Sequence, residues 1–219
     1  MLVIGDTHIP FEHPQYLDFC LDIQHRVKCG TIVHAGDLCD LHSISYHEHE
    51  PDGWSPADEM AEADKRLAKW FKAFPKLYIT KGNHDRLPDR KRKTAGLPSR
   101  CFQSFRNIWN IPNGWKDDFE FELYGVRFVH GCGYSGKHAH MQAAYDSRQS
   151  CVIGHLHSTA GIEYIANNKD CIYGMQVGCG ISRSAYTFAY GRDFRFKPIL
   201  SCGVITDNGA YAQVFKMPL

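Results

Sequence analysis

A chain of 219 residues with 43% hydrophobic and 22% charged residues has a globular composition, which excludes a disordered, collagen-like or coiled-coil protein. The charges nearly cancel, with 25 Lys and Arg against 24 Asp and Glu, so neither a globally basic nucleic-acid binder nor an acidic tail is indicated. The length predicts a single domain over residues 1–219. The 13 histidines are the outlier, and because histidine is the commonest metal ligand they suggest a metal site.

The nine cysteines are odd in number, spread along the chain and without a C-x-x-C pair, which argues against a disulfide framework or a zinc knuckle. We interpret them as buried thiols in a reducing compartment. The first residues are typical of a strand and not of a signal peptide, and no run approaches 18 apolar residues, so no membrane span is predicted. The expected location is the cytoplasm.

Three short apolar runs, at residues 2–4, 31–34 and 77–80, predict buried strands. Apolar residues at helical spacing predict helices between them, at 14–27 and 55–74. A strand–helix–strand–helix–strand order implies parallel strands joined by right-handed crossovers. Ligands bind at the carboxyl ends of such strands. We therefore expect Asp6, Asp37 and Asn83, which follow the three strands, to lie near one another.

The second half of the chain is predicted to be rich in β-structure. Three hairpins are expected, at 119–130, 162–175 and 199–216, together with a strand at 151–153 and a helix at 138–149. Residues 38–53 predict a long loop, and the basic stretch 86–106 predicts two short helices broken at 96–99. Residues 181–197, rich in aromatic residues and arginine, are assigned to a loop whose conformation the sequence does not predict.

Five polar signatures punctuate the predicted strands. In chain order they are Gly5-Asp6-Thr7-His8, Gly36-Asp37, Gly82-Asn83-His84-Asp85, Val129-His130-Gly131 and Gly154-His155-Leu156-His157. Asp, Asn and His form a mixed oxygen and nitrogen set, which suits borderline divalent ions such as Mn, Fe, Ni or Zn better than Ca or Mg alone. A glycine beside each signature fits a backbone that turns tightly to bring the side chains together.

In this order the five blocks follow the pattern D-x-H, G-D, G-N-H-[D/E], H and G-H-x-H, which resembles the calcineurin-like metallophosphoesterases. The match runs from Asp6 to His157, about two-thirds of the chain. The resemblance implies an α/β fold of four layers, αββα, in which a β-sandwich is flanked by helices. The predicted β-rich second half agrees with that architecture.

The resemblance also implies a ligand set for two divalent ions, with manganese as the first expectation and iron, nickel or zinc as alternatives. It assigns Asp6, His8 and His157 to one ion, Asn83, His130 and His155 to the other, and Asp37 as the bridge between them. Two cations held about 3.5–4 Å apart need an anionic bridge, which a carboxylate supplies. A hydroxide bridging the two ions is the expected nucleophile.

Three residues beside the ligand Asn83 are assigned further roles. His84 is implied to be a catalytic residue that contacts the phosphate and protonates the leaving oxygen, alongside the catalytic bridge Asp37. Asp85 is expected either to fix the tautomer of His84 or to support the ligands from behind. Arg86 is a candidate substrate-binding residue that contacts the phosphate.

Other polar residues carry weaker expectations. His42, Tyr46, His47 and His49 belong either to substrate contacts or to a solvated loop. His34 is expected to be packed, His138 and His140 to lie on the surface, and Cys39 and Cys132 to pack. The basic stretch 86–106 is either a landing surface for a polyanion, which makes nucleic acid a candidate partner, or a solvated helix face. The segment 181–197 fits single-stranded nucleic acid or, equally, a packing or oligomer surface.

The motifs also bear on the substrate. No Arg follows Asp37 closely and Asp85 replaces Glu, which counts against a Ser/Thr protein phosphatase. The forms Gly-Asp-Leu-x-Asp and Gly-Asn-His-Asp resemble phosphodiesterases and recombination-repair nucleases, although those nucleases are larger and carry a capping domain. The loop after Asp37 is similar to small bacteriophage metallophosphoesterases.

The sequence thus predicts a phosphodiesterase or nuclease-like hydrolase. The alternatives are a phosphomonoesterase acting on nucleotides or proteins, and a metal-binding interaction module; substrate, native metal and oligomeric state stay open.

Overall fold

The computed structural model describes residues 1–46, 52–186 and 196–218. A six-stranded sheet has the order β11-β10-β1-β2-β3-β4, and a five-stranded sheet has the order β5-β6-β7-β9-β8. The strands of the first sheet are β1 (Leu2–Ile4), β2 (Ile32–His34), β3 (Leu77–Thr80), β4 (Trp115–Asp118), β10 (Ser201–Thr206) and β11 (Tyr211–Lys216). Those of the second are β5 (Glu120–Leu123), β6 (Val126–Val129), β7 (Ser150–Ile153), β8 (Gly161–Ala166) and β9 (Cys171–Gln176).

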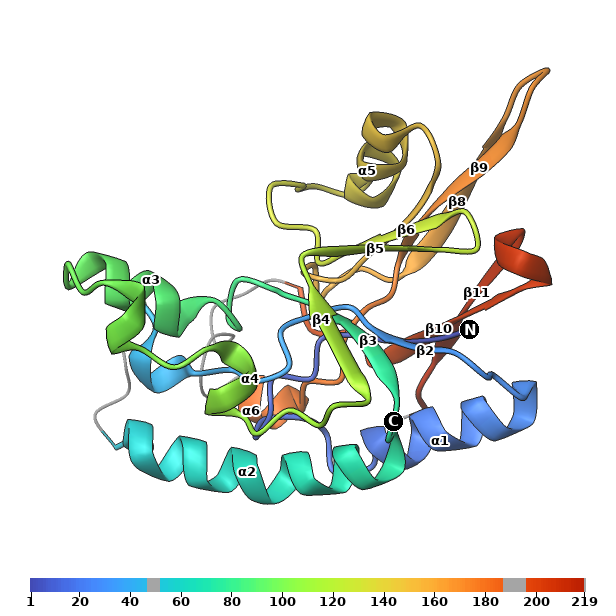
Figure 1. Cartoon of the computed structure of the whole chain (residues 1–219). Coiled ribbons are helices and arrows are strands. Elements are labelled where there is room, and N and C mark those ends of the chain that lie inside the picture. Colours follow the sequence, from blue (N-terminus) through green and yellow to red (C-terminus); the bar gives the residue numbers. More distant parts are fainter. Residues whose placement is uncertain (47–51, 187–195, 219) are drawn as a thin grey trace.

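The helices lie outside the two sheets (Figure 1). They are α1 (Tyr16–Val27), α2 (Pro56–Ala73), α3 (Leu87–Thr94), α4 (Phe105–Ile108), α5 (Ala139–Ser147) and α6 (Arg183–Tyr186), with 3-10 turns at His42–Ile44, Ser99–Cys101 and Asp207–Gly209. Figure 1 shows α1 and α2 side by side beneath the six-stranded sheet, whereas α5 lies beyond the five-stranded sheet.

The buried side chains of one strand show how the layers are held. In β1, Leu2 and Ile4 belong to the core that includes Trp70 of α2, while Val3 belongs to the core between the two sheets. This alternation follows from the period of two in a strand, which turns successive side chains to opposite faces. A third cluster joins α5 to Ile153 of β7. The result is the four-layer αββα architecture, and the predicted fold class is confirmed.

The predicted parallel core is present. β1 pairs in parallel with β2, and β2 with β3, and the two crossovers contain α1 and α2. The carboxyl ends of these strands therefore meet at one edge of the sandwich. The predicted hairpins β5–β6, β8–β9 and β10–β11 are all antiparallel pairs.

Strand β4 was not predicted. It pairs in parallel with β3, matching Leu77 with Trp115. Its sequence, Trp-Lys-Asp-Asp, offers one apolar residue and no alternation that would reveal a strand. Tertiary contacts fix it, because the buried indole of Trp115 donates a 2.6 Å hydrogen bond to the carbonyl oxygen of Phe74 and Asp117 accepts from Arg106 at 2.5 Å.

Helix α2 holds the long loop after β2. Its first turn is capped by the side chain of Ser55, which accepts from the N–H of Asp58 at 3.2 Å, as the Ser-Pro start predicts. One turn further, the buried carboxylate of Glu59 accepts hydrogen bonds from the N–H groups of His42 and Ser43, at 3.0 and 2.9 Å. The loop that carries Asp37 is thereby tied to the rigid helix beneath it.

Two sequence-based expectations about burial are wrong in part. All nine cysteines are free thiols, but Cys101, Cys132 and Cys171 are exposed because they lie on loops and a hairpin end instead of in the core. His140 is buried, contrary to the expected surface position, because it lies on the face of α5 that packs against β7 and β9. His138 is exposed as expected, and it contacts Glu163 at 2.5 Å.

Among the described residues, no helix has both the length and the apolar character needed to cross a membrane. The single domain over residues 1–219 and the cytoplasmic location stay predictions. Helix α6 forms within the segment 181–197, most of which lies outside the described residues.

Candidate metal centre

The loops that follow five strands deliver the predicted ligands to one edge of the sandwich. Asp6 and His8 follow β1, and Asp37 follows β2. Asn83 follows β3, His130 follows β6, and His155 and His157 follow β7. These loops come from both sheets, so the residues meet although up to 151 positions separate them in the sequence. The structure brings together all seven residues to which the sequence assigned metal ions.

One group of donors surrounds the end of β1. One ligand atom each from Asp6, His8, Asp37 and His157 lies within 4.8 Å of the other three. The Nε2 atom of His157 is 3.1 Å from Oδ2 of Asp6 and 3.2 Å from Nε2 of His8. This group contains the three residues expected at the first ion together with the expected bridge.

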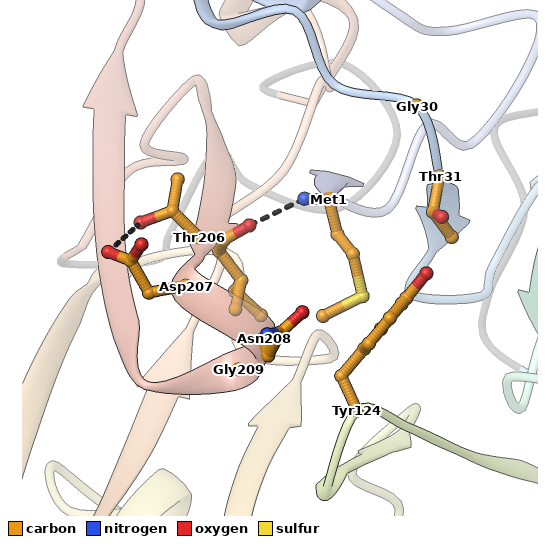
Figure 2. A pocket seen from close by; sticks show the side chains of 9 residues that line it. Met1, Gly30, Thr31, Tyr124, Thr206, Asp207, Asn208 and Gly209 are labelled. Carbon is orange, nitrogen blue, oxygen red and sulfur yellow. Dashed lines mark hydrogen bonds between the residues drawn. The ribbon is translucent and has the colours of Figure 1, made fainter.

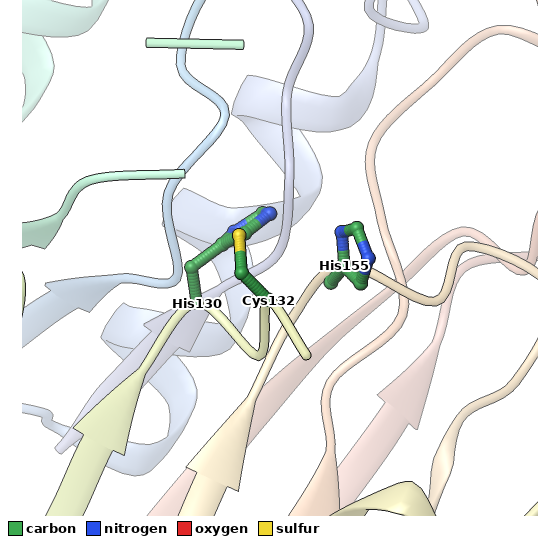
Figure 3. Close-up of side chains that lie close together, drawn as sticks. All are labelled: His130, Cys132 and His155. Atoms are coloured by element: carbon green, nitrogen blue, oxygen red, sulfur yellow. The ribbon is translucent and has the colours of Figure 1, made fainter. Parts of the chain in front are cut away.

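A second group surrounds the end of β6. The Nε2 atom of His130 is 3.1 Å from Oδ1 of Asn83 and 3.0 Å from Oδ2 of Asp37. His155 lies beside His130 with ring centroids 5.1 Å apart, and the thiol of Cys132 completes the cluster (Figure 3). Cys132 was expected to pack, but it is exposed and lies beside His130 and His155.

Asp37 lies between the two groups. Its Oδ2 atom is 3.0 Å from Nε2 of His130 and 3.6 Å from Nε2 of His8. Its Oδ1 atom accepts the backbone N–H of His84 at 2.8 Å. One carboxylate oxygen thus faces a donor of each group, which is the placement that a bridging ligand requires.

Hydrogen bonds at Nδ1, on the side of the ring away from the site, fix the tautomers of two histidines. Nδ1 of His130 donates to the carbonyl oxygen of Ala35 at 2.9 Å, and Nδ1 of His8 is 2.6 Å from Oδ1 of Asp40. A carbonyl or a carboxylate can only accept, so in the neutral ring the proton sits on Nδ1 and the lone pair of Nε2 faces the centre. Metal-binding histidines in proteins are commonly held in this way.

The charges of the site also fit cations. Asp6, Asp37, Asp40 and Asp85 are all buried within it. Burial would raise the pKa of Asp37, but His130 and His84 outweigh it and hold that pKa well below its usual range. For His130, burial is outweighed by Asp37 and Asp6, which raise its pKa. Burial and the charge of Asp37 raise the pKa of Asp85 to about 7.

One buried oxygen is left unused by the protein. Within the described part of the chain, Oδ1 of Asp6 accepts no hydrogen bond although it is shielded from solvent. A buried carboxylate oxygen without a partner is costly, and a divalent ion would satisfy it. The donor set, the fixed tautomers and this oxygen therefore fit a pair of divalent ions.

The backbone is strained at three of the predicted ligands. His8, Asp37 and His155 have φ values of 48°, 49° and 69°, in the left-handed region that side chains with a Cβ rarely occupy. Such a conformation costs on the order of 1–3 kcal/mol per residue and persists where surrounding structure enforces it. It turns these side chains toward the shared centre.

Glycines next to the ligands allow close approach. A side chain at Gly82 would collide with Oδ1 of Asp37, and one at Gly154 would collide with Oδ1 of Asp6. The predicted need for glycine beside the signatures thus has a steric cause at these two positions, where the carboxylates pass directly over the neighbouring backbone.

His84 lies at the mouth of the site. Its Nδ1 donates to the backbone carbonyl oxygen of Asp40, which leaves Nε2 as the atom that can exchange a proton. Its ring contacts the ring of His8 edge to face at 4.5 Å. Burial would lower the pKa of His84, but Asp37 and Asp40 outweigh it and raise that pKa above its usual value.

Asp85 takes the second of its two expected roles. Its carboxylate accepts the N–H groups of Asp37, Leu38 and Gly82 at 2.8, 3.0 and 2.9 Å, so it joins the loops after β2 and β3. The ring of His84 is instead held by Asp40, a residue to which the sequence analysis gave no role. The signal for Asp40 was its position in the Gly-Asp-Leu-x-Asp pattern.

Arg86 lies in a cleft of about 360 Å³ that adjoins the ligands. The cleft is lined on one side by Lys81, Arg86 and Phe119 and on the other by His130 and Tyr134. The Arg86 guanidinium lies 5.6 Å from the centre of the exposed Phe119 ring. Arg86 is therefore near the predicted site, as expected for a substrate contact.

Most of the basic stretch 86–106 has structural partners. Arg92 and Lys93 each contact Asp89 at 2.8 Å. Lys91 donates to the carbonyl oxygen of Ser45 at 3.0 Å and lies 3.9 Å from the centre of the Tyr46 ring. These contacts favour the solvated helix face over a continuous landing surface.

The remaining histidines behave differently from one another. His34 is packed as expected, with Nε2 3.1 Å from the hydroxyl of Thr7. His42 contributes its backbone N–H to Glu59. His47 and His49 lie outside the described residues.

A second hollow, of about 230 Å³, lies at the opposite ends of the strands (Figure 2). Met1, Thr31 and Tyr124 line it from the starts of strands, and the turn at Asp207–Gly209 closes it. The amino group of Met1 donates to the carbonyl oxygen of Ile205 there. No metal-ligating group found among the described residues lies at this end.

The fold and the placement of the predicted ligands agree with a metallophosphoesterase. The family model of the calcineurin-like phosphoesterases matches residues 1–170, and the chain belongs to this family. A search of curated proteins gave no match. Among solved structures, the crystal structure of Vps29 from Chaetomium thermophilum is similar at 13% identity and a TM-score of 0.42, covering 99% of this chain and 95% of that one.

Proposed function

We propose that the protein hydrolyses phosphodiesters with the help of two divalent ions. Membership of a family composed mostly of phosphoesterases supports a metal-dependent phosphoester hydrolase in general terms. One observation carries the proposal further, namely the meeting of the six other assigned donors around Asp37.

The proposed site divides the donors as the resemblance implies. Asp6, His8 and His157 would hold one ion, Asn83, His130 and His155 the other, and Asp37 both. Bound there, two divalent ions supply Lewis acidity, which acidifies a water and offsets charge on the phosphoryl oxygens. Manganese is the first ion to test, followed by iron, nickel and zinc.

The chain's own residues would orient the substrate and move a proton. His84 would donate from Nε2 to the leaving oxygen, since its Nδ1 is occupied by the Asp40 carbonyl. Asp40 would hold the ring in place, and Asp85 would keep the loops after β2 and β3 together.

The cleft beside His130 supports a diester over a monoester. A diester carries a second substituent on phosphorus, and that group needs space next to the reacting atom. Arg86 and Phe119 offer a cationic and an aromatic surface there, which would suit a nucleotide moiety. Nucleic acid is therefore a proposed substrate class, and a phosphomonoester is the alternative.

A comparison of rates on two substrates tests the proposal. Bis(p-nitrophenyl) phosphate and p-nitrophenyl phosphate would be assayed with Mn²⁺, Ni²⁺, Zn²⁺ and a chelator. We expect the diester to be cleaved faster, and we expect His84→Ala to lose about 10²–10⁴-fold in kcat while still binding metal. The exposed His25→Ala on α1 is the matched control. Faster cleavage of the monoester would favour a phosphomonoesterase, and a wild type inert toward both would favour the interaction module.

Removing Arg86 tests the cleft separately. Arg86→Ala is expected to raise KM for the diester about tenfold, the effect of losing a cation–π contact of about 1–2 kcal/mol with the aromatic second substituent, and to affect the monoester less. Arg100→Ala, exposed in the same basic stretch, is the control. Equal changes for both substrates would argue against a role of the cleft in holding the second substituent.

A further inference from the structure

The thiol of Cys132 lies among the donors assigned to the second ion. Cys132 follows His130 by two residues on the loop after β6, and Figure 3 shows its sulfur beside the His130 ring, with His155 opposite. Its Sγ atom is 3.6 Å from Oδ1 of Asn83. One ligand atom each from His130, Cys132 and His155 lies within 4.8 Å of the other two.

The spacing fits a shared coordination sphere. With a metal–sulfur bond of about 2.3 Å and a metal–oxygen bond of about 2.1 Å, two ligands of one ion lie about 3.1 Å apart at a right angle and about 3.6 Å apart at a tetrahedral angle. The observed 3.6 Å separation of the Cys132 sulfur and the Asn83 amide oxygen lies at the upper end of this range. Nε2 of His130 is 3.1 Å from the same oxygen, so an oxygen, a sulfur and a nitrogen donor lie close together at the position proposed for the second ion.

We propose that Cys132 is a ligand of the second ion, and that it makes this position selective for a thiophilic ion such as Zn²⁺, Fe²⁺ or Co²⁺ over Mn²⁺. The inference rests on the metal pair of the proposed function. A thiolate is a soft donor, and soft donors prefer these ions to manganese. The thiol releases its proton to solvent as the sulfur–metal bond forms, and the exposed position of Cys132 leaves a path for that proton.

The chain supplies internal controls for this assignment. Cys101 and Cys171 are also exposed free thiols, but neither belongs to a cluster of metal-ligating side chains in the described parts of the chain. A non-specific reaction of surface thiols with metal would involve these two as well, whereas coordination at the site would involve Cys132 alone.

Cobalt provides a direct test. Metal-stripped protein would be titrated with Co²⁺, with absorption spectra and bound metal recorded at each step. We expect a near-ultraviolet sulfur-to-cobalt charge-transfer band in the wild type and in the double variant Cys101→Ser/Cys171→Ser. The band is expected to vanish in Cys132→Ser. Bound cobalt without this band, or a band that survives in Cys132→Ser, would overturn the assignment.

Affinity separates a ligand from a merely structural thiol. Competition with a chromophoric chelator is expected to show a loss of more than about 100-fold in Zn²⁺ affinity for Cys132→Ser, beyond the range of about 10–100-fold seen when a residue that only supports a ligand is removed. The Mn²⁺ affinity is expected to change much less, because a hydroxyl remains a suitable hard donor. Equal losses for both ions would contradict the selectivity. A wild type that takes up neither cobalt nor zinc would overturn the metal pair itself, an outcome distinct from metal uptake without sulfur coordination.

Discussion

Asp40 shows how a residue that need not touch the substrate can organise the centre. Its carboxylate is 2.6 Å from Nδ1 of His8, while its backbone carbonyl accepts from Nδ1 of His84. One residue thus orients a proposed ligand and the proposed general acid, which belong to different loops. The carboxylate also makes the His8 ring a more basic donor.

Removing that charge gives a prediction at the scale of a single residue. Asp40→Asn keeps the size of the side chain and one acceptor oxygen but loses the negative charge behind His8. We expect the affinity of the stripped protein for Zn²⁺ to fall about tenfold or more, measured by chelator competition. Asp22→Asn on the exposed surface of α1 is the control. An unchanged affinity would show that His8 does not depend on Asp40 for its donor strength.

At the scale of elements, helix α2 acts as a support for the loop that carries Asp37. Glu59 on this helix holds the backbone at His42 and Ser43. Burial raises the pKa of Glu59 above its usual value near 4.5, although the hydrogen bonds from Ser43 act in the opposite direction. The charged form of this carboxylate is therefore less favourable in the folded protein than in the unfolded chain.

The sign of this shift gives a prediction for stability against pH. A raised folded-state pKa contributes stability that is fully present below pH 4.5 and is lost as pH rises through the folded-state pKa. The variant Glu59→Gln has no ionisable group at this position, so it does not lose stability from ionisation there as pH rises. The free energy of unfolding of the variant relative to wild type should therefore rise between pH 4 and pH 7, measured by urea denaturation. A relative free energy that stays constant or falls over this range would contradict the assigned shift.

The elements also show what the sequence could and could not predict. β1, β2 and β3 are short apolar runs that end in polar loops, and α2 begins with Ser55-Pro56, so local signals sufficed for them. Strand β4 has no such signal and depends on contacts of Trp115 and Asp117 that only the folded chain provides. The same applies to Asp40, whose role depends on two rings that are distant from it in sequence.

The site itself was largely predicted by a pattern of five blocks, since the structure brings all the named donors together. Their roles as ligands stay predictions. Cys132 was expected to pack because cysteine is not among the ligands that the resemblance implies, while its position beside Asn83 arises from the arrangement of two sheets. Burial of His140 was missed for a similar reason, because a short helix does not reveal which face it packs.

At the scale of the whole molecule, the proposed ions join parts of the chain that are otherwise connected by packing. The donors of the first sheet follow β1, β2 and β3, and those of the second follow β6 and β7. Binding to the folded state alone should therefore stabilise the entire sandwich.

Metal removal tests this at the same scale. Zn²⁺ at about 100 times its Kd should add about 2.7 kcal/mol to the free energy of unfolding. For a chain of this length that corresponds to an increase in Tm of about 5–10 °C over the chelated protein. Calorimetry would measure it, with Asp37→Asn as the variant expected to lose most of the increase. Equal Tm values with and without metal would contradict the proposed centre.

The placement of all these donors at one edge has a mechanical consequence. Ions bound there would connect the two sheets at the carboxyl ends of β1 and β6. The opposite edge, with Met1 and Tyr124, is closed by a turn and side-chain packing. Two sheets that are held together at one edge separate first at the other edge. With the proposed ions bound, the two sheets should therefore begin to separate at the Tyr124 edge. Loss of the ions would allow the edge that carries the predicted ligands to open as well.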